Sequence, residues 1–140
     1  RFVKLHHITN GAYPTLTWHE EGMPPHDMMV PAMCLQIPVE NALKHAFSPI
    51  MPESRIEVYI KFSDDMLSLR IVDNGRGYSP GLIPQTGRDT GTGIRVLSRT
   101  IHLLNARNSR QASLFIGNRT DGQHGTEVKL NIPRDYQWEM

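Results

Sequence analysis

Residues 30–45 read V-P-A-M-C-L-Q-I-P-V-E-N-A-L-K-H, and this stretch predicts an amphipathic helix that opens at Pro31. A proline fits the first helical position, because the N–H that it lacks would have no partner there. Pro38 lies inside the same helix and is expected to remove one hydrogen bond and kink the axis. The helix is expected to end at Ser48-Pro49. The apolar residues that recur at helical spacing and predict its buried face are Leu35, Val39, Ala42 and Ala46.

Alternating apolar and polar residues predict strands on both sides of this helix. Two of the alternating runs flank Asp64-Asp65, which predicts an antiparallel hairpin with one buried face. The predicted strands cover residues 14–21, 56–62, 67–71, 114–116 and 128–132.

A second helix is predicted to start near Gly91, after a long loop. The loop covers residues 74–91 and is rich in glycine, with two prolines. A loop of this length in a compact domain is usually functional or mobile. The residues that predict the buried stripe of the second helix are Ile94, Leu97, Ile101 and Leu104.

The order of these elements predicts the fold class. Strand, helix, two strands, loop, helix and two strands indicate an α+β two-layer sandwich, with helices on one face of a mixed sheet. A length of 140 residues suits one domain. We expect residues 1–13 to be the remnant of an upstream linker or helix, residues 14–133 to form the core, and residues 134–140 to form a C-terminal tail.

Composition excludes several classes of protein. Hydrophobic residues make up 39% and charged residues 21% of the chain, which is typical of a globular domain. The formal charge of +1 argues against nucleic acid as a direct partner. Cys34 is the only cysteine, so an internal disulfide and a multi-cysteine zinc site are excluded. No apolar run is long enough to span a bilayer. Because the chain begins at Arg1, we expect it to be part of a longer protein.

Three short stretches carry residues suited to chemistry, and the first lies on the first helix. Asn41, Lys44 and His45 are spaced to share one helix face. An amide oxygen can ligate Mg²⁺ and an ammonium group can bind phosphate. The alternative is a solvated helix face with a Glu40–Lys44 ion pair.

The second stretch, residues 71–77, reads I-V-D-N-G-R-G. Asp73 ends a buried strand, and Gly75 and Gly77 let the backbone turn and approach a ligand closely. A carboxylate at this place can accept a hydrogen bond from the exocyclic amine of adenine. The alternative is an ordinary turn that ends a strand.

The third stretch is Thr90-Gly91-Thr92-Gly93-Ile94, at the start of the second helix. Backbone N–H groups at a glycine-rich helix start favour an anion, such as a triphosphate. The sequence matches neither the Walker pattern nor the Rossmann fingerprint. The alternative is a helix N-cap at Thr90 or Thr92.

In this order, the three stretches resemble the N, G1 and G2 boxes of the GHKL ATPase superfamily. More narrowly, residues 30–45 resemble the P-x-x-x-L-Q-x-x-V-E-N-A-x-x-H segment of LytS-type sensor histidine kinases. Residues 125–128, G-T-E-V, resemble the closing glycine-threonine strand of that family. The resemblance covers residues 30–133 and implies the Bergerat (GHKL) ATP-binding fold, which binds ATP with Mg²⁺ under a mobile lid, here residues 78–90.

The resemblance also implies a role for individual residues. Asn41 is similar to the metal-binding asparagine, and Glu40 is the adjacent acid of the catalytic set, which also includes Asn41 and Lys44. Asp73 is similar to the adenine-reading aspartate. The residues implied on the phosphate side are Lys44, His45, Gly91, Thr92 and Gly93. The residues implied on the adenine side, with Asp73, are Gly75, Gly77 and Thr126.

The sequence departs from the family at two places. Val96 and Ser98 occupy the region of the second helix where many members have an asparagine. Ile37, followed by Pro38, stands where a proline is common after the Leu-Gln pair. Neither departure changes Asn41 or Asp73.

The implied function is that of a protein-histidine kinase in a two-component system. This chain would supply the ATP-binding catalytic domain, and the γ-phosphoryl group would pass to a histidine on an upstream dimerisation domain and then to a response regulator. His6 and Asn10 have an H-x-x-x-N spacing, but the stretch from His6 to Pro31 is too short for a helical hairpin. The accepting histidine is therefore expected upstream of Arg1. We expect a homodimeric full-length protein, a monomeric fragment, and a cytoplasmic position in a membrane-anchored sensor.

Two other functions are compatible with the same fold. The first is a non-catalytic nucleotide-binding module, and the presence of Asn41 and Asp73 argues against it. The second is an ATP-driven clamp of the GHKL type. Such clamps carry a catalytic glutamate four residues before the asparagine, and Ile37 occupies that position here.

Overall fold

The computed structural model describes residues 15–22, 24–45, 53–78 and 92–139. The expectations for residues 1–13, for the end of the first helix after His45, and for Gly91 and the lid beyond Tyr78 lie outside the described residues. Within the described ranges the chain forms a five-stranded sheet and two helices. The elements in chain order are β1 (Thr15–Glu21), α2 (Met33–His45), β2 (Arg55–Ser63), β3 (Met66–Asp73), α3 (Thr92–Asn105), β4 (Ser113–Asn118) and β5 (Thr126–Pro133).

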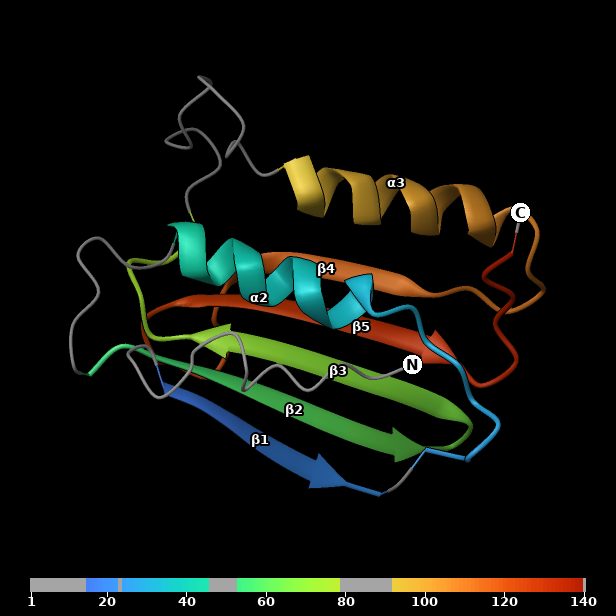
Figure 1. Ribbon diagram of the computed structural model, residues 1–140, viewed down its shortest axis with the longest axis horizontal. Coiled ribbons are helices and arrows are strands. Elements are labelled where there is room, and N and C mark those ends of the chain that lie inside the picture. Colours follow the sequence, from blue (N-terminus) through green and yellow to red (C-terminus); the bar gives the residue numbers. More distant parts are fainter. Residues whose placement is uncertain (1–14, 23, 46–52, 79–91, 140) are drawn as a thin grey trace.

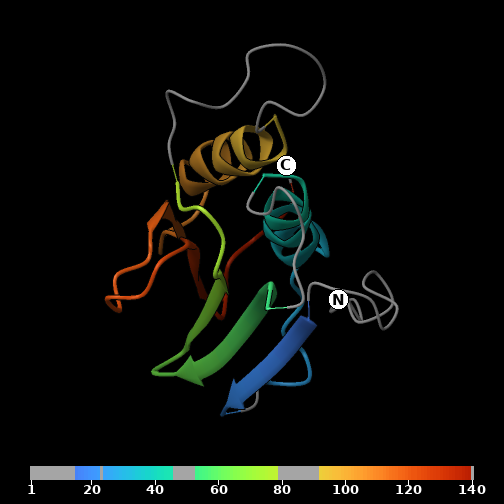
Figure 2. The same ribbon diagram turned by 90° about the vertical axis from the view of Figure 1, so that its left-hand side faces the viewer.

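The sheet is mixed, as the sequence predicted. Its strand order is β1-β2-β3-β5-β4. β1 runs parallel to β2, whereas β2–β3, β3–β5 and β4–β5 are antiparallel pairs. Both helices cover the same face of the sheet (Figures 1 and 2), and α2 packs over β3 and β5 while α3 packs beside it over β4. The predicted α+β two-layer sandwich is confirmed.

The β2–β3 hairpin turns at the two aspartates that the sequence singled out. Asp64 and Asp65 have φ angles of 54° and 57°, and the flanking Ser63 and Met66 are paired in the ladder. Positive φ at both central residues is the geometry of the two-residue turn that matches the twist of antiparallel strands. Aspartate is among the few residues with a side chain that adopt it at small cost.

Helix α2 begins later than predicted. Its first helical residue is Met33, so the prediction that the helix opens at Pro31 is wrong by two residues. The carbonyl of Pro31 accepts a hydrogen bond from the N–H of Cys34 at 3.0 Å, which places Pro31 in the turn before the helix. Pro38 lies inside the helix, as expected.

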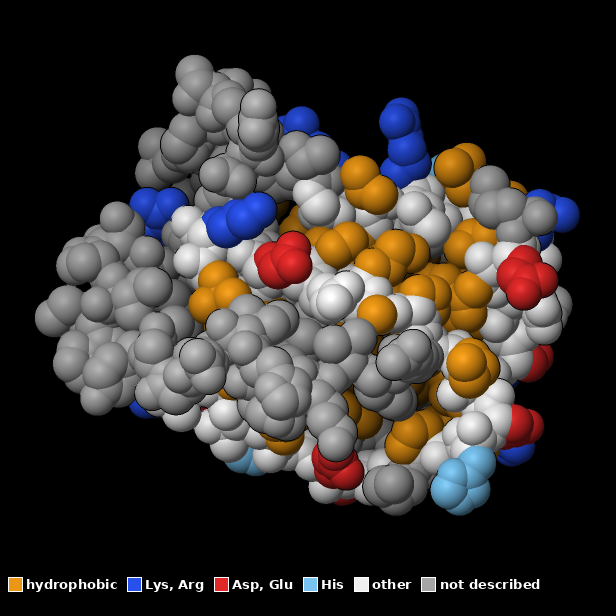
Figure 3. All heavy atoms as spheres, in the orientation of Figure 1, with side chains coloured by type: hydrophobic (Ala, Val, Ile, Leu, Met, Phe, Trp, Pro, Cys, Tyr) orange, Lys and Arg blue, Asp and Glu red, His pale blue; other side chains and the backbone are white. Residues whose placement is uncertain are grey.

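The core lies between the helices and the sheet. It includes the alternating residues of β2, β3 and β5 and, from the predicted stripes of the two helices, Leu35, Val39, Ala42, Leu97, Ile101 and Leu104. Ile94 is also buried, and Ala46 lies outside the described residues. Figure 3 shows apolar side chains gathered along the line where α2 and α3 run side by side. Tyr136, beyond the last strand, is also buried in this core, and its hydroxyl donates to Asn105 Oδ1 at 2.8 Å. Among the described residues, no helix is both long enough and apolar enough to cross a membrane.

One end of the sandwich gathers the ends of several elements (the left of Figure 1, which faces the viewer in Figure 2). α2 and β3 finish there, and α3 and β5 start there. Each of the three stretches singled out from the sequence therefore has at least part of its length at this end.

Candidate functional site

Asp73 is the best-defined side chain at this end of the sandwich. It is the last residue of β3 and is 3% exposed. Its Oδ1 accepts two hydrogen bonds, from Gly75 N at 2.9 Å and from Thr126 N at 3.1 Å. Because both bonds go to one oxygen, Oδ2 is the oxygen that neither of them uses. The fold thus fixes the direction of this carboxylate.

The protonation of Asp73 reflects a balance between burial and hydrogen bonding. Burial raises the pKa of Asp73 above its ordinary value, and the N–H groups of Gly75 and Thr126 offset only part of that rise. The charges of Arg119 and His124 lower the pKa further but do not cancel the effect of burial. The native state therefore bears a cost for keeping this carboxylate charged.

Two glycines are required by the close approach of β4, β5 and the loop after Asp73. Gly77 has a φ of 92°, and a Cβ there would lie 2.9 Å from Asn118 Oδ1. The same Oδ1 accepts a hydrogen bond from Tyr78 N at 2.8 Å. Gly125 has a φ of 143°, and a Cβ there would lie 1.9 Å from the carbonyl oxygen of Asp73. A side chain at either position would displace the loop that carries the carboxylate.

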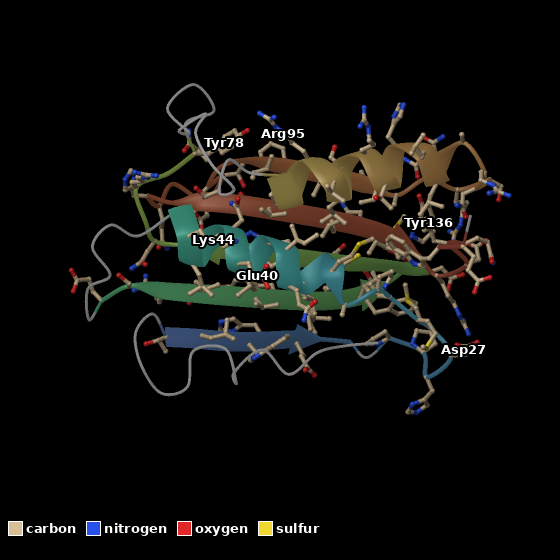
Figure 4. All side chains as sticks on the ribbon, turned by 45° about the horizontal axis from the view of Figure 1, so that its top comes forward. Asp27, Glu40, Lys44, Tyr78, Arg95 and Tyr136 are labelled. Carbon is tan, nitrogen blue, oxygen red and sulfur yellow. The ribbon has the colours of Figure 1, made fainter. Side chains whose placement is uncertain are left out.

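The predicted residues on α2 differ in their exposure. Asn41 is half-buried, whereas Glu40 and Lys44 are exposed on α2, and Figure 4 labels Glu40 and Lys44 on that helix and Tyr78 on the loop after β3. The backbone of His45 is helical, and its side chain lies outside the described part of the structure.

Gly93 lets the start of α3 lie close to α2. A Cβ on Gly93 would come within 3.1 Å of Ile37 Cγ2, which is tighter than ordinary van der Waals contact. Thr92 is the first residue of α3, but its side chain and Gly91 are outside the described residues. Ile37 therefore spaces the two helices at this end.

Comparison with known proteins identifies the family. Residues 31–136 match the family model described as histidine kinase-, DNA gyrase B-, and HSP90-like ATPase. The chain belongs to this ATPase family. The fold and the order of the three stretches agree with that assignment, and the resemblance found in the sequence is confirmed.

Curated relatives of this ATPase domain are sensor proteins. The chain is 33% identical over 112 residues to the sensor protein LytS of Bacillus subtilis, an alignment that covers 74% of this chain and 18% of that protein. It is 32% identical over 114 residues to the sensor protein LytS of Streptococcus agalactiae, covering 78% of this chain and 19% of that protein. The chain thus spans about a fifth of the length of these relatives.

Solved structures with the same fold include histidine kinase domains. One is the histidine kinase domain of the blue-light activated histidine kinase EL346 of Erythrobacter litoralis, with a TM-score of 0.58 and 21% identity over 96% of this chain and 61% of that one. Another is the catalytic domain of the histidine kinase ThkA, with a TM-score of 0.61 and 14% identity over 93% of this chain and 85% of that one. At these identities the likeness confirms the expected ATPase fold.

Sequence reasoning missed two residues that shape the candidate site. Asn74 Nδ2 donates to Glu53 O, and Asn74 Oδ1 accepts from Arg55 N, both at 2.8 Å, so Asn74 ties the loop to the start of β2. Asn118 holds the loop from the other side through Tyr78. An asparagine directly after Asp73 was a visible signal for the first contact, because asparagine often bonds nearby backbone in turns. Nothing local to residue 118 indicates the second.

Proposed function

We propose that this ATPase domain is the ATP-binding catalytic domain of a two-component sensor histidine kinase. The observation that carries the proposal is Asp73, a buried carboxylate held by Gly75 N and Thr126 N at the end of the sandwich where α3 begins. The sensor-protein relatives support the kinase assignment.

The adenine base is proposed to bind at Asp73. An ionised carboxylate is an acceptor only, and adenine presents a donor at its exocyclic amine where guanine presents a carbonyl oxygen. Two acceptors facing each other in a buried site are unfavourable, and a buried polar group without a partner costs about 1–3 kcal/mol. Gly75 and Gly77 shape the loop beside the base, and Thr126 lies on the same side. The site is therefore expected to select ATP over GTP.

The triphosphate is proposed to lie between α2 and the start of α3. Lys44 and His45 supply cationic or hydrogen-bonding groups from α2, and residues 91–93 supply backbone N–H groups at a helix N-terminus. Asn41, with its amide oxygen, is the proposed protein ligand for Mg²⁺, and the ion would neutralise phosphate charge when bound. Within the described ranges no group of three or more His, Cys, Asp or Glu side chains is placed to hold a metal.

The chain supplies positioning and charge for phosphoryl transfer. Lys44 and the N-terminus of α3 would oppose the negative charge that builds up on the transferred group, and Glu40 is proposed as the acid of the catalytic set. The acceptor is proposed to be a histidine on a dimerisation domain that lies outside this chain, with a response regulator as the next acceptor. The full-length protein is proposed to be a homodimeric, membrane-anchored sensor with this domain in the cytoplasm.

Ile37 argues against a clamp that hydrolyses ATP by itself. It stands four residues before Asn41, where such clamps carry a glutamate, and here its methyl group faces Gly93. An apolar side chain at that place cannot activate water as a general base.

Equilibrium binding tests the nucleotide assignment. Calorimetric titration of the domain with ATP, ADP and GTP, with and without Mg²⁺, is expected to show ATP preferred over GTP by at least about tenfold and ATP binding strengthened by Mg²⁺. Equal affinity for ATP and GTP would remove the adenine assignment. Phosphoryl transfer from the ATP-loaded domain to a separately supplied histidine hairpin of a LytS relative tests the kinase assignment, and a domain that binds ATP but transfers nothing would point to a non-catalytic module.

A further inference from the structure

Arg119 is a buried cation directly behind the site. It lies just past the end of β4, and its side chain is 3% exposed. Its Nη1 donates to the carbonyl oxygen of Asp73 at 3.1 Å. Its Nε and Nη2 donate to the two carboxylate oxygens of Asp121, at 3.1 and 2.6 Å. This bidentate pair fixes the plane of the guanidinium group.

The carbonyl of Asp73 depends on this guanidinium group because the sheet ladder stops short of it. Pairing between β3 and β5 ends at Val72 and Glu127. Beyond that pair, Gly125 packs against the Asp73 carbonyl so closely that a Cβ would lie 1.9 Å from its oxygen and 3.1 Å from Arg119 Cδ. Arg119 therefore takes the place of the strand partner that β5 no longer provides at residue 73.

Asp121, which anchors Arg119, is itself held on the face of the sheet opposite the helices. Asp121 also accepts from Arg70 Nη2 at 3.0 Å, and Arg70 Nε donates to the buried Glu127. Glu127 Oε1 accepts from both the N–H and the hydroxyl of Thr120, each at 2.9 Å. Burial pushes the pKa of Glu127 up, but these bonds outweigh it and leave the pKa below its ordinary value. The turn between β4 and β5 is thus held by charged groups.

We propose that Arg119 is a positioning residue for nucleotide binding, which holds the Asp73 peptide from behind so that its carboxylate keeps the direction needed to read the base. The proposal rests on the function proposed above. Arg119 touches the backbone of Asp73 and not the carboxylate, so it acts through Asp73. Without it, the Asp73 carbonyl loses this donor, and the peptide is held only from its other side, where Asn74 N donates to Arg55 O at 3.3 Å, so that its carboxylate is less firmly directed at Gly75 N and Thr126 N.

The same geometry gives a readout that separates positioning from general stabilisation. Two charged groups of the β4–β5 turn, Arg119 and His124, lower the pKa of Asp73. Removing Arg119 should raise that pKa, so the Asp73 carboxylate should become protonated at a higher pH. As the pH is lowered, the variant should therefore lose nucleotide binding at a higher pH than the protein that retains Arg119. The comparison is made in a His124→Gln background, so that Arg119 is the charged group whose removal is tested.

The experiment compares Arg119→Met with two matched variants by calorimetry. Arg119→Met keeps most of the apolar stem and should lose about tenfold in affinity for both ADP and ATP, with the relative strengthening by Mg²⁺ unchanged. Arg119→Lys keeps a donor and the charge and should recover part of the loss, and it remains informative if Arg119→Met does not fold. Arg110→Met makes the same change at an exposed arginine paired with Asp135 and should bind as the wild type does.

The outcomes separate this inference from the proposed function. If the wild type binds no adenine nucleotide, the proposed function fails first. If the wild type binds ADP and needs Asp73 to do so, while folded Arg119→Met binds ADP equally well, only the role of Arg119 is overturned. The role of Arg119 is also overturned if Arg119→Met binds more weakly but loses binding at the same pH as the wild type does. That result would describe a purely structural arginine.

Discussion

The two halves of the proposed nucleotide site are built in different ways. On the base side, Asp73 is buried and is fastened through its carboxylate by Gly75 and Thr126 and through its carbonyl by Arg119. On the phosphate side, Glu40 and Lys44 are exposed on a helix and Asn41 is half-buried. The base side is therefore made by the fold itself, whereas the phosphate side is made by two helix ends. The groups that bind the base should be largely preorganised, whereas the arrangement of the groups that bind the phosphates should depend on the ion and the ligand.

The largest effect is expected from removing the carboxylate that is proposed to bind the base. Asp73→Ala deletes the acceptor that the fold holds in place, so affinity for ATP should fall by at least about tenfold and the preference over GTP should vanish. Calorimetric titration with both nucleotides measures the two changes together. Normal ATP affinity in this variant would show that the preorganised half is not the base site.

A second prediction tests the preorganisation of the base side without changing a polar side chain. Gly125→Ala places a Cβ 1.9 Å from the Asp73 carbonyl oxygen at a φ of 143°. It should lower the free energy of unfolding by about 1–3 kcal/mol and weaken ADP binding as well. Gly122→Ala is the matched control, because Gly122 also has a positive φ of 82° but has no atom within 4 Å of the added Cβ. Equal losses in urea unfolding for the two variants would mean that backbone strain alone, and not contact with Asp73, is responsible.

The phosphate half is tested by Asn41→Ala. Alanine is the better helix former, so α2 should persist while the proposed Mg²⁺ ligand is lost. ATP affinity without Mg²⁺ should change by less than about twofold, and most of the strengthening by Mg²⁺ should disappear. Gln36→Ala, on the same helix, serves as the control in calorimetry. An unchanged response to Mg²⁺ would assign the ion to other groups.

The smallest effect separates stability from function at one side chain. Because burial raises the pKa of Asp73 in the native state, keeping it charged costs stability above that pKa, and the cost disappears as pH falls through it. Asp73→Asn should therefore be slightly more stable than the wild type at pH 7, with a gap that narrows on acidification, while its ATP affinity is lower. Urea unfolding across the acid range checks the sign. A gap that widens at low pH would contradict it.

Most of the fold could be predicted because its signals are local. The stripe of Ile94, Leu97 and Ile101 specifies a helix, and the alternation around Asp64-Asp65 specifies a hairpin, within short windows. Asp73 could be singled out for the same reason, since it ends a buried strand before a glycine. The start of α2 was misplaced because Pro31 is equally compatible with the turn before a helix and with its first position.

The features that could not be predicted depend on contacts between distant residues. The parallel pairing of β1 with β2 joins Thr15 to Arg55, and no local pattern specifies which edge a strand joins. Arg119 reaches Asp73 across 46 positions of sequence, so its own neighbourhood shows only a polar turn. The base side of the proposed site thus depends on both local and long-range contacts, and only the residues with local signals could be predicted from the sequence.

The hydrogen bond from Thr126 to Asp73 spans 53 positions of sequence, and this separation has a consequence for biosynthesis. Chains emerge from the ribosome in order, at about 5–20 residues per second, so Asp73 is exposed for several seconds before its partner exists. The β2–β3 hairpin can form in that interval because its contacts are local. The proposed base site cannot form until the last strand has docked. We therefore expect nucleotide binding only after the whole domain has folded, and a nascent chain that lacks β5 should not bind ATP.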